Sequence, residues 1–218
     1  DALVVAGATD AGLWVTKDLA RYDHVVSLAE VAELRAITVA DDHVEIGAAA
    51  TYSDLLPVAE RCWPAFAEML KRLGSELIRN SGTLGGNLGS ASPIGDCLPV
   101  LVALDATLVL RKGAARREVA AEDFFLDYKK TLLEPGEFVE RVRLPRLDEA
   151  VKLHVEKVSK RFDQDISAVL AAVCLRVEDG RISRPRVAMG GMAAIPKRAP
   201  AAEAALAGAP LDDTAFLA

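Results

Sequence analysis

The sequence predicts an α+β protein of two domains, and three observations support this. Its 218 residues suffice for one large domain or two small ones. The first 145 residues mix short strands and hairpins with capped helices. After Pro145 the pattern changes to long alternating segments, a long hairpin and an alanine-rich tail. We therefore place a boundary near 145–150 and expect domains at 1–147 and 148–218.

In the first domain, apolar runs bounded by turn residues define the strands. They are expected at 3–6 as a buried strand ended by Gly7, at 24–28, in a hairpin over 36–51 that turns at 41–42, in a hairpin over 107–120 that turns at 112–113, and at 138–145. Capping residues define the helices. They are expected from Thr51 or Ser53 to 60, from Pro64 to Gly74, and over 97–106.

The second domain begins with an alternating segment over 150–161. Residues 167–191 then form a long hairpin, which is expected to turn at Asp179 and Gly180. A helical tail is expected from Pro196 onward.

Composition excludes several classes of protein. There are 32 acidic and 26 basic residues without a basic run, which argues against nucleic-acid binding. No apolar stretch reaches the ~18 residues of a membrane span, and no signal peptide opens the chain. The three cysteines and three histidines are too scattered to hold a metal or an iron–sulfur cluster. Reduced, scattered thiols fit a cytoplasmic protein.

Two glycine-rich segments carry the chemical signal. Residues 4–12 (VVAGATDAG) run from an apolar strand into small residues, and residues 81–96 (SGTLGGNLGSASPIGD) contain five glycines. Such segments can present backbone N–H groups to a phosphate, although a single one is more often an ordinary turn. Neither a GxGxxG fingerprint nor a GxxxxGK[ST] loop is present. Because no Lys or Arg lies between 81 and 96, the pattern favours a pyrophosphate diester such as FAD over a nucleoside triphosphate.

The segments LVVAGATDAG, TLGGNLGSASPIGDCLPVLVALDA, FFLDYKKTLLEPGEFVERVRLP and KVSKR, in this order, resemble the FAD-binding domain of the molybdenum hydroxylases, above all the xanthine dehydrogenases. The resemblance covers nearly the whole chain, and its most specific part is GGN followed by SPIGD. It implies an FAD-binding domain of the vanillyl-alcohol-oxidase and CO-dehydrogenase-flavoprotein type, followed by a smaller α+β C-terminal domain. It also implies an element before Asp1, a truncated C-terminal domain and a longer parent polypeptide.

The resemblance assigns cofactor contacts. The first segment is expected to wrap the FAD pyrophosphate with Val4, Val5, Ala6, Gly7, Ala8, Thr9, Asp10 and Ala11. The second is expected to contribute Thr83, Leu84, Gly85, Gly86, Asn87 and Ser90. Further contacts fall on Leu73, Asp96, Val139 and Lys157. From the residues alone, Asp96 is a helix N-cap, Val139 a core residue and Lys157 a solvated strand lysine.

Two departures from the family pattern concern the flavin and its acceptor. Leu73 stands where mammalian members have an aromatic residue, so apolar packing replaces ring stacking. The segment SKRFDQDI (159–166) is one residue longer than the family pattern. The resemblance implies that this segment lies near the flavin and the electron acceptor.

The function implied by the resemblance is that of an electron-transfer module. Electrons from a molybdopterin cofactor and [2Fe–2S] clusters in other domains or subunits would reach FAD here and leave as hydride on NAD⁺. No catalytic side chain is assigned. A carbon monoxide dehydrogenase flavoprotein, a flavoprotein of the vanillyl-alcohol-oxidase or enolpyruvyl-glucosamine reductase type, and a non-catalytic assembly module remain alternatives.

Overall fold

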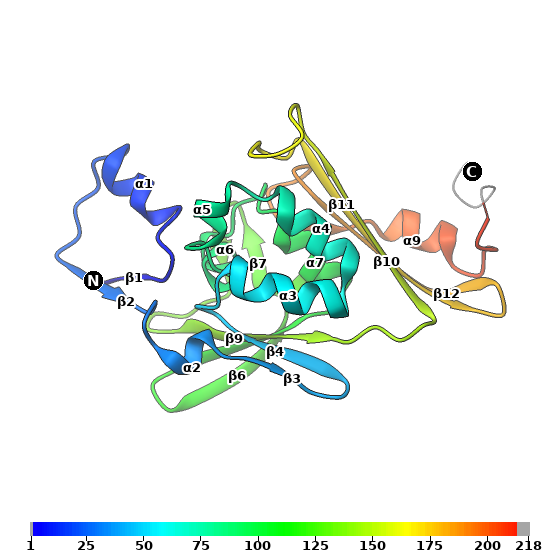
Figure 1. The fold of residues 1–218 in the computed structure, drawn as a ribbon, viewed down its shortest axis with the longest axis horizontal. Coiled ribbons are helices and arrows are strands. Elements are labelled where there is room, and N and C mark those ends of the chain that lie inside the picture. Colours follow the sequence, from blue (N-terminus) through cyan, green and yellow to red (C-terminus); the bar gives the residue numbers. More distant parts are fainter. Residues whose placement is uncertain (1, 213–218) are drawn as a thin grey trace.

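A five-stranded antiparallel sheet, here called the central sheet, lies below the helices in Figure 1. The computed structural model describes residues 2–212. The sheet has the order β3-β4-β9-β5-β6. Its strands are β3 (Ile37–Val39), β4 (His43–Gly47), β9 (Phe138–Pro145), β5 (Thr107–Lys112) and β6 (Ala115–Ala120). Both predicted hairpins of the first domain are confirmed, and Gly113 turns the second with a φ of +59°.

Four helices lie over one face of this sheet: α3 (Tyr52–Cys62), α4 (Pro64–Arg72), α6 (Leu84–Ser90) and α7 (Cys97–Ala103) (Figure 1). The core between them contains Trp63, Phe66, Leu108 and Leu110, all fully buried. Trp63 also donates its indole N–H to the carbonyl of Pro145 over 2.8 Å, so the largest core side chain leaves no buried donor unpaired.

Thr51, rather than Ser53, caps α3. Its hydroxyl accepts from the Asp54 N–H, and the Asp54 carboxylate accepts from the Thr51 N–H, which makes a reciprocal capping box. Pro64 opens α4 as predicted, and Gly74 follows its end with a φ of +54°.

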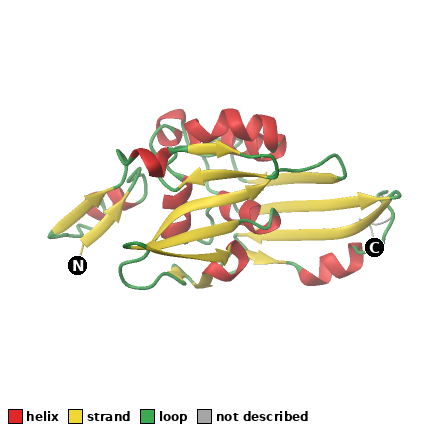
Figure 2. Cartoon of the chain, turned by 90° about the horizontal axis from the view of Figure 1, so that it is seen from below, coloured by secondary structure: helices red, strands yellow, loops and turns green. Residues whose placement is uncertain are grey.

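A second antiparallel sheet follows, with the order β10-β11-β12-β13 (Figure 2). Its strands are β10 (Val151–Val158), β11 (Val169–Glu178), β12 (Arg181–Gly190) and β13 (Lys197–Arg198). Asp179 and Gly180 both have positive φ, which confirms the predicted turn. The tail prediction is wrong at its start, because residues 197–198 pair with β12 before α9 (Pro200–Leu206) begins.

The two sheets share one hydrophobic core. Helix α7 contacts β11, β12 and β13, and Leu170, Ala172 and Ala188 of the second sheet belong to the same buried cluster as Leu108. Helix α9 lies against β12, where Leu206 packs on a smaller cluster. The boundary at 147 and 148 stays a prediction, and residues 213–218 of the expected second domain lie outside the described residues.

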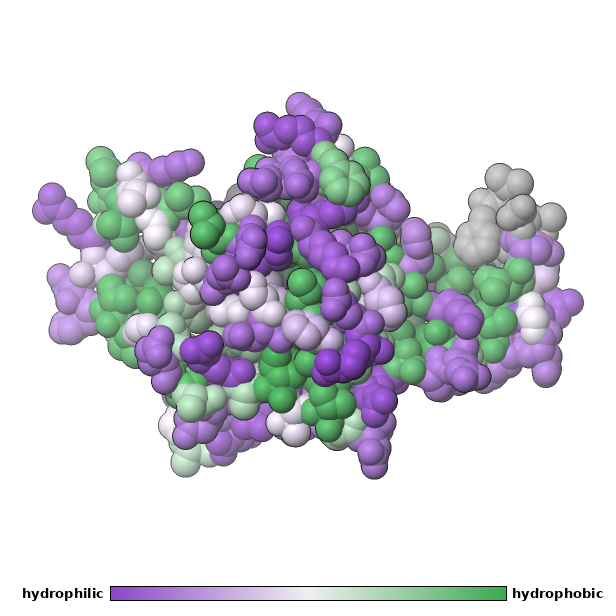
Figure 3. All heavy atoms as spheres, in the orientation of Figure 1, coloured by the Kyte–Doolittle hydropathy of each residue, from purple (hydrophilic) through white to green (hydrophobic). Residues whose placement is uncertain are grey.

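The N-terminal lobe consists of β1 (Ala2–Val5), α1 (Ala11–Thr16) and β2 (His24–Ser27), with β1 and β2 paired in parallel. The prediction of a buried first strand is wrong, because none of the residues of β1 is buried and Val4 is 49% exposed. Figure 3 shows apolar side chains at the surface of this lobe. The reason is that a sheet of two strands beside one short helix cannot cover both faces.

Five short elements connect these layers. They are α2 (Ala32–Arg35), α5 (Glu76–Arg79), α8 (Ala121–Phe124), β7 (Phe125–Asp127) and β8 (Lys130–Thr131). The separate helices and antiparallel sheets confirm the predicted α+β class. None of the helices within residues 2–212 is both long and apolar enough to cross a membrane.

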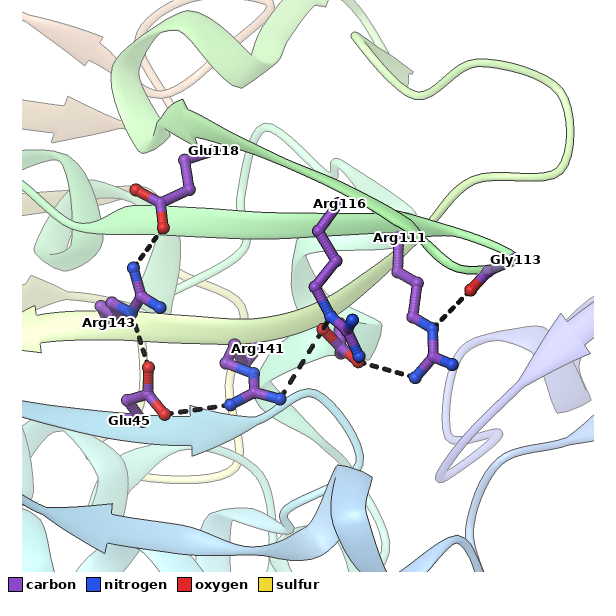
Figure 4. Close-up of polar contacts among 8 residues, drawn as sticks. Glu45, Arg111, Gly113, Arg116, Glu118, Arg141 and Arg143 are labelled. Carbon is purple, nitrogen blue, oxygen red and sulfur yellow. Dashed lines mark hydrogen bonds and ion pairs between the residues drawn. The ribbon is translucent and has the colours of Figure 1, made fainter.

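An ionic network crosses the central sheet, as Figure 4 shows. The side chain of Glu140 is only 3% exposed, and it accepts hydrogen bonds from Arg116 and Arg111 over 2.6–2.9 Å. These bonds, with the Arg116 bond the largest cause, lower the pKa of Glu140 to about 2. Arg141 continues the network to Glu45, which also binds Arg143. The buried carboxylate is thus compensated by arginines of β5, β6 and β9 itself.

Candidate functional site

A cavity of about 470 Å³ lies between the N-terminal lobe, α6 and β9. This volume is in the range of cofactor pockets. Most of the predicted contacts line it: Val4, Val5, Ala6, Gly7, Ala8, Thr9, Asp10, Ala11, Thr83, Gly85, Gly86, Asn87, Ser90 and Val139. The structure therefore brings the two glycine-rich segments together around one space, although they are about seventy residues apart in the sequence.

The two segments touch directly at Gly7. A Cβ atom at Gly7 would lie 1.7 Å from the Ser81 carbonyl oxygen, so no other residue fits without moving the backbone. The next residue, Ala8, has a φ of +54°, in the left-handed region. Within residues 2–212, the backbone N–H groups of Gly7, Ala8, Thr9 and Asp10 have no hydrogen-bond partner. The first segment thus presents consecutive free donors at the cavity wall, the arrangement that suits an anion.

The second segment is built differently from the prediction. It is not a loop: residues 84–90 form α6, which Thr83 caps by accepting from the Gly86 N–H over 3.0 Å. The Gly85 N–H donates to the Ala48 carbonyl over 3.0 Å, and a Cβ at Gly85 would lie 2.5 Å from the Ala48 Cβ. The expectation of free N–H groups here is therefore wrong at Gly85 and Gly86. Gly85 lets the helix approach Ala48, the residue that follows β4.

Asn87 gives α6 a different polar contact with the cavity. Its side-chain Oδ1 is buried and has no hydrogen-bond partner among the described residues. Leaving such an acceptor unpaired costs free energy, so a donor from a ligand is the natural partner. Two residues further along α6, a Cβ at Gly89, which also lines the cavity, would meet nothing within 4 Å. This open space lies where a bound molecule would approach the helix.

Four predicted contacts lie outside the cavity lining: Leu73, Leu84, Asp96 and Lys157. Leu84 is fully buried in the core, and Leu73 packs against that core just after α4. The Leu73 carbonyl accepts from Arg79, whose Nη1 also binds the carbonyls of Lys71 and Gly74 over 3.0–3.1 Å. A single guanidinium therefore fixes the backbone around Leu73.

Asp96 and Lys157 form a buried cluster with Ser167. Lys157 is only 3% exposed, and its Nζ lies 2.5 Å from Asp96 Oδ2 and 2.9 Å from the Ser167 hydroxyl. Ser167 in turn donates to Asp96 Oδ1. The reading of Lys157 as a solvated lysine is wrong. Asp96 occupies the N-cap position of α7, but its side chain makes no cap bond. Gly95, the residue before Asp96, lines the cavity.

The longer segment 159–166 is held by Arg72 of α4. Arg72 donates to the Phe162 carbonyl over 2.8 Å, and its guanidinium lies 4.9 Å from the centroid of the Phe162 ring. The segment therefore packs against the residue that precedes Leu73.

Sequence reasoning missed a third wall of the cavity. Leu133, Glu137 and Phe138 line it beside Val139. Both oxygens of Glu137 bind Arg117 over 2.7–2.8 Å, and these bonds lower the pKa of Glu137 to about 2. No local sequence signal marks these residues, because Glu137 is paired with Arg117, which lies on the distant strand β6. The other lining residues that were missed are Leu3, Trp14, Leu28, Ala48, Ala49, Tyr52, Gly89, Ser92 and Gly95.

The charges of the lining are unusual for a phosphate site. Asp10 and Glu137 are its ionisable carboxylates, and neither Lys nor Arg belongs to the lining within residues 2–212. Any phosphate here would be held by backbone N–H groups rather than by side-chain cations. Tyr52 adds a buried hydroxyl, and desolvation by its surroundings raises its pKa well above the usual value, so it stays neutral.

Two family models match the chain. The model described as the FAD-binding domain in molybdopterin dehydrogenase matches residues 1–147, and the CO dehydrogenase flavoprotein C-terminal domain matches residues 155–218. These matches confirm the family to which the sequence pattern pointed.

Individual relatives belong to the same family as these two models. Xanthine dehydrogenase of Emericella nidulans is 33% identical over the whole chain, which spans only 17% of that protein. The carbon monoxide dehydrogenase medium chain of Hydrogenophaga pseudoflava is 30% identical over 88% of the chain and 68% of its own length.

The solved structure of carbon monoxide dehydrogenase from Hydrogenophaga pseudoflava, a form lacking the Mo-pyranopterin moiety, superimposes with a TM-score of 0.92. It is 31% identical, and the match covers 98% of this chain and 75% of that one. This agreement confirms an FAD-binding domain followed by a C-terminal domain of the CO-dehydrogenase-flavoprotein type. With the cavity, the glycine segments and both family models in agreement, the chain belongs to the FAD-binding flavoproteins of the molybdenum hydroxylase family.

Proposed function

We propose that this chain is the FAD module of a cytoplasmic, xanthine dehydrogenase-like molybdenum hydroxylase. In this role it receives electrons from [2Fe–2S] clusters and passes hydride to NAD⁺ while hypoxanthine and xanthine are oxidised to urate at a molybdenum cofactor held elsewhere. The observation that supports FAD binding most directly is the row of unpaired N–H groups from Gly7 to Asp10 at the wall of a large cavity.

The residues present fit FAD. The free N–H groups of Gly7 to Asp10 suit a pyrophosphate diester, which needs fewer compensating cations than a triphosphate. Asn87 Oδ1, buried and unpaired, offers an acceptor to an N–H or O–H of the cofactor. When bound, FAD supplies the redox chemistry, and the protein supplies orientation and electrostatics.

Lys157 and Asp96 are proposed to act at the flavin end, as the family resemblance implies. The buried ammonium of Lys157 would favour negative charge on the flavin ring. Asp96 and Ser167 hold this ammonium in place. Leu73, held through its carbonyl by Arg79, would present an apolar surface to the ring. These assignments rest on the resemblance, because the described cavity does not reach these side chains.

The partners proposed for this module follow from its relatives. One relative is named as the medium chain of carbon monoxide dehydrogenase, which indicates a complex of several chains. We propose that this chain works within a hetero-oligomer containing a molybdenum-cofactor subunit and a [2Fe–2S] domain.

A carbon monoxide dehydrogenase-like flavoprotein is the second candidate. The chain spans 68% of the carbon monoxide dehydrogenase medium chain but only 17% of the Emericella xanthine dehydrogenase, and it superimposes on the former with a TM-score of 0.92. The two candidates share the FAD site and differ in the substrate and in the final electron acceptor.

The test begins with the visible absorption spectrum of the purified full-length polypeptide. The cofactor is released by acid and identified by chromatography. Stoichiometric FAD supports the flavoprotein assignment, whereas a folded, colourless protein would leave an assembly module as the better interpretation. Anaerobic reduction of the bound flavin by NADH then separates the two candidates, because only the xanthine dehydrogenase-like module is expected to exchange hydride with NAD⁺.

A further inference from the structure

The wall formed by residues 132–139 is held in shape by one ion pair. Arg117 of β6 donates from Nε and Nη2 to the two carboxylate oxygens of Glu137 over 2.8 and 2.7 Å. The same Nη2 donates to the Leu132 carbonyl over 3.0 Å, and Glu137 Oε2 accepts from the Glu134 N–H over 2.8 Å. The ion pair therefore fixes the backbone on both sides of Leu133, through the Leu132 carbonyl and the Glu134 N–H, and Leu133 lines the cavity.

This ion pair differs from the surface pairs on the same sheet. The side chain of Glu137 is 6% exposed, and it lies in the cavity lining, whereas that of Glu118, next to Arg117 in the sequence, is 56% exposed and lies outside the lining. A bidentate pair with one buried partner has a fixed geometry, and its loss leaves a buried group unpaired. Glu137 Oε1 accepts only one hydrogen bond within the described residues, so one acceptor position remains for a ligand.

The two sides of the cavity differ in polarity, because one presents polar side chains and the other mainly apolar ones. The side formed by α6 and the turn after it supplies Asn87, Ser90 and Ser92, which suit the heteroatom edge of a flavin ring. The 132–139 wall supplies the apolar side chains of Leu133, Phe138 and Val139 and a single carboxylate. Apolar surface suits the faces of a purine, and a carboxylate commonly accepts hydrogen bonds from ribose hydroxyls in dinucleotide sites.

We propose that Arg117 and Glu137 are a positioning pair for the adenosine half of the cofactor, and that they set the selectivity of the site for FAD over FMN. FMN lacks the adenosine that this wall would contact, so its binding does not depend on the pair. This inference rests on the proposed function, because it requires that FAD occupies the cavity.

The experiment measures dissociation constants of the flavin-free full-length polypeptide for FAD and FMN, by quenching of flavin fluorescence. For Glu137→Gln we expect the Kd for FAD to rise about tenfold, as for the loss of one charge-assisted contact, and the Kd for FMN to stay within about twofold. Glu118→Gln is the matched control, since it removes an Arg-paired carboxylate from the same region outside the cavity, and it should change neither value.

The outcomes separate this inference from the function on which it rests. Failure of the wild-type polypeptide to bind FAD overturns the proposed function. Tight FAD binding by the wild type with an unchanged FAD-to-FMN ratio in Glu137→Gln overturns the positioning role, as does an equal loss of both flavins, which would indicate a purely structural pair. If Glu137→Gln fails to fold, Arg117→Lys keeps the charge while losing the bidentate geometry, and the same shift in the ratio is expected from it.

Discussion

Lys157 Nζ lies 2.5 Å from Asp96 Oδ2, and both side chains are more than nine-tenths buried. The pair joins β10 of the second sheet to the start of α7 beneath the first. Ser167 closes the cluster by bonding to both partners. A buried charge pair of this kind stabilises the fold little by itself, yet removing one partner is costly because the other remains buried and uncompensated.

Lys157→Met should therefore destabilise the fold by about 3–5 kcal/mol, because the Asp96 carboxylate stays buried without its cation. The double variant Asp96→Asn with Lys157→Met should recover a large part of this loss. Urea denaturation of the full-length polypeptide measures both changes. Lys152→Met, at an exposed position of the same strand, serves as control and should cost less than about 0.5 kcal/mol. Equal effects at the two lysines would contradict the buried-pair interpretation.

Gly89→Leu should abolish FAD binding while leaving the fold intact. A Cβ atom at Gly89 would meet no protein atom within 4 Å, and Gly89 lines the cavity, so a larger side chain there should take up space that the cofactor needs. Gly89 is a better site for this test than Gly86, where a Cβ would lie 2.9 Å from the Thr83 hydroxyl that caps the helix. The measurements are flavin content and thermal unfolding. Gly12→Leu is the control, since Gly12 is equally open but lies outside the lining, and it should retain flavin.

Asn87→Leu should stabilise the flavin-free protein by about 1 kcal/mol and weaken FAD binding at the same time. The first effect follows because an unpaired buried acceptor is removed. The second follows because the cofactor loses a hydrogen-bond acceptor. Melting temperatures without FAD, together with the Kd for FAD, test the prediction. A variant that is less stable yet binds FAD normally would show that Asn87 Oδ1 has a purely internal role.

Acid should weaken the central sheet through Glu140. Its hydrogen bond with Arg116, more than any other contact, lowers its pKa to about 2, so it binds protons less readily in the folded state than in the unfolded chain. The resulting stabilisation is fully present above the ordinary glutamate pKa near 4.5 and is lost as the pH falls toward 2.

Glu140→Gln should accordingly cost about 1–3 kcal/mol at pH 7 and flatten the dependence of stability on pH below about 4.5. Denaturation midpoints at several pH values measure this slope. Glu156→Gln, at an exposed site of β10, should leave the slope unchanged. A slope that is equally steep in Glu140→Gln and wild type would assign acid sensitivity to other groups.

Local chemistry made the hairpins predictable. Asp179 and Gly180 are residues that tolerate positive φ between two alternating runs, and Gly113 plays the same part in the first domain. The family, the α+β class and the convergence of the two glycine segments on one cavity also followed from the sequence pattern.

The sequence misled where distant contacts decide the structure. Glycine propensity argues against a helix over 84–90, yet the Thr83 cap and the close approach to Ala48 stabilise α6. Lys157 reads as a solvated strand residue because its partner Asp96 is 61 residues away. The wall around Glu137 depends in the same way on Arg117 of β6, which is 20 residues away in the sequence.

The contrast between the two glycine segments has a consequence for how the cofactor is loaded. Helix α6 has its first N–H groups already bonded to Ala48, Ala50 and Thr83, so this side of the pocket is complete before any ligand arrives. Four consecutive N–H groups without a partner within residues 2–212, those of Gly7 to Asp10, lie on the segment that follows β1, and this segment approaches the Ser81 carbonyl at Gly7. Flavin binding would therefore form new backbone hydrogen bonds on the β1 side of the pocket and would leave the hydrogen bonds at the start of α6 as they are.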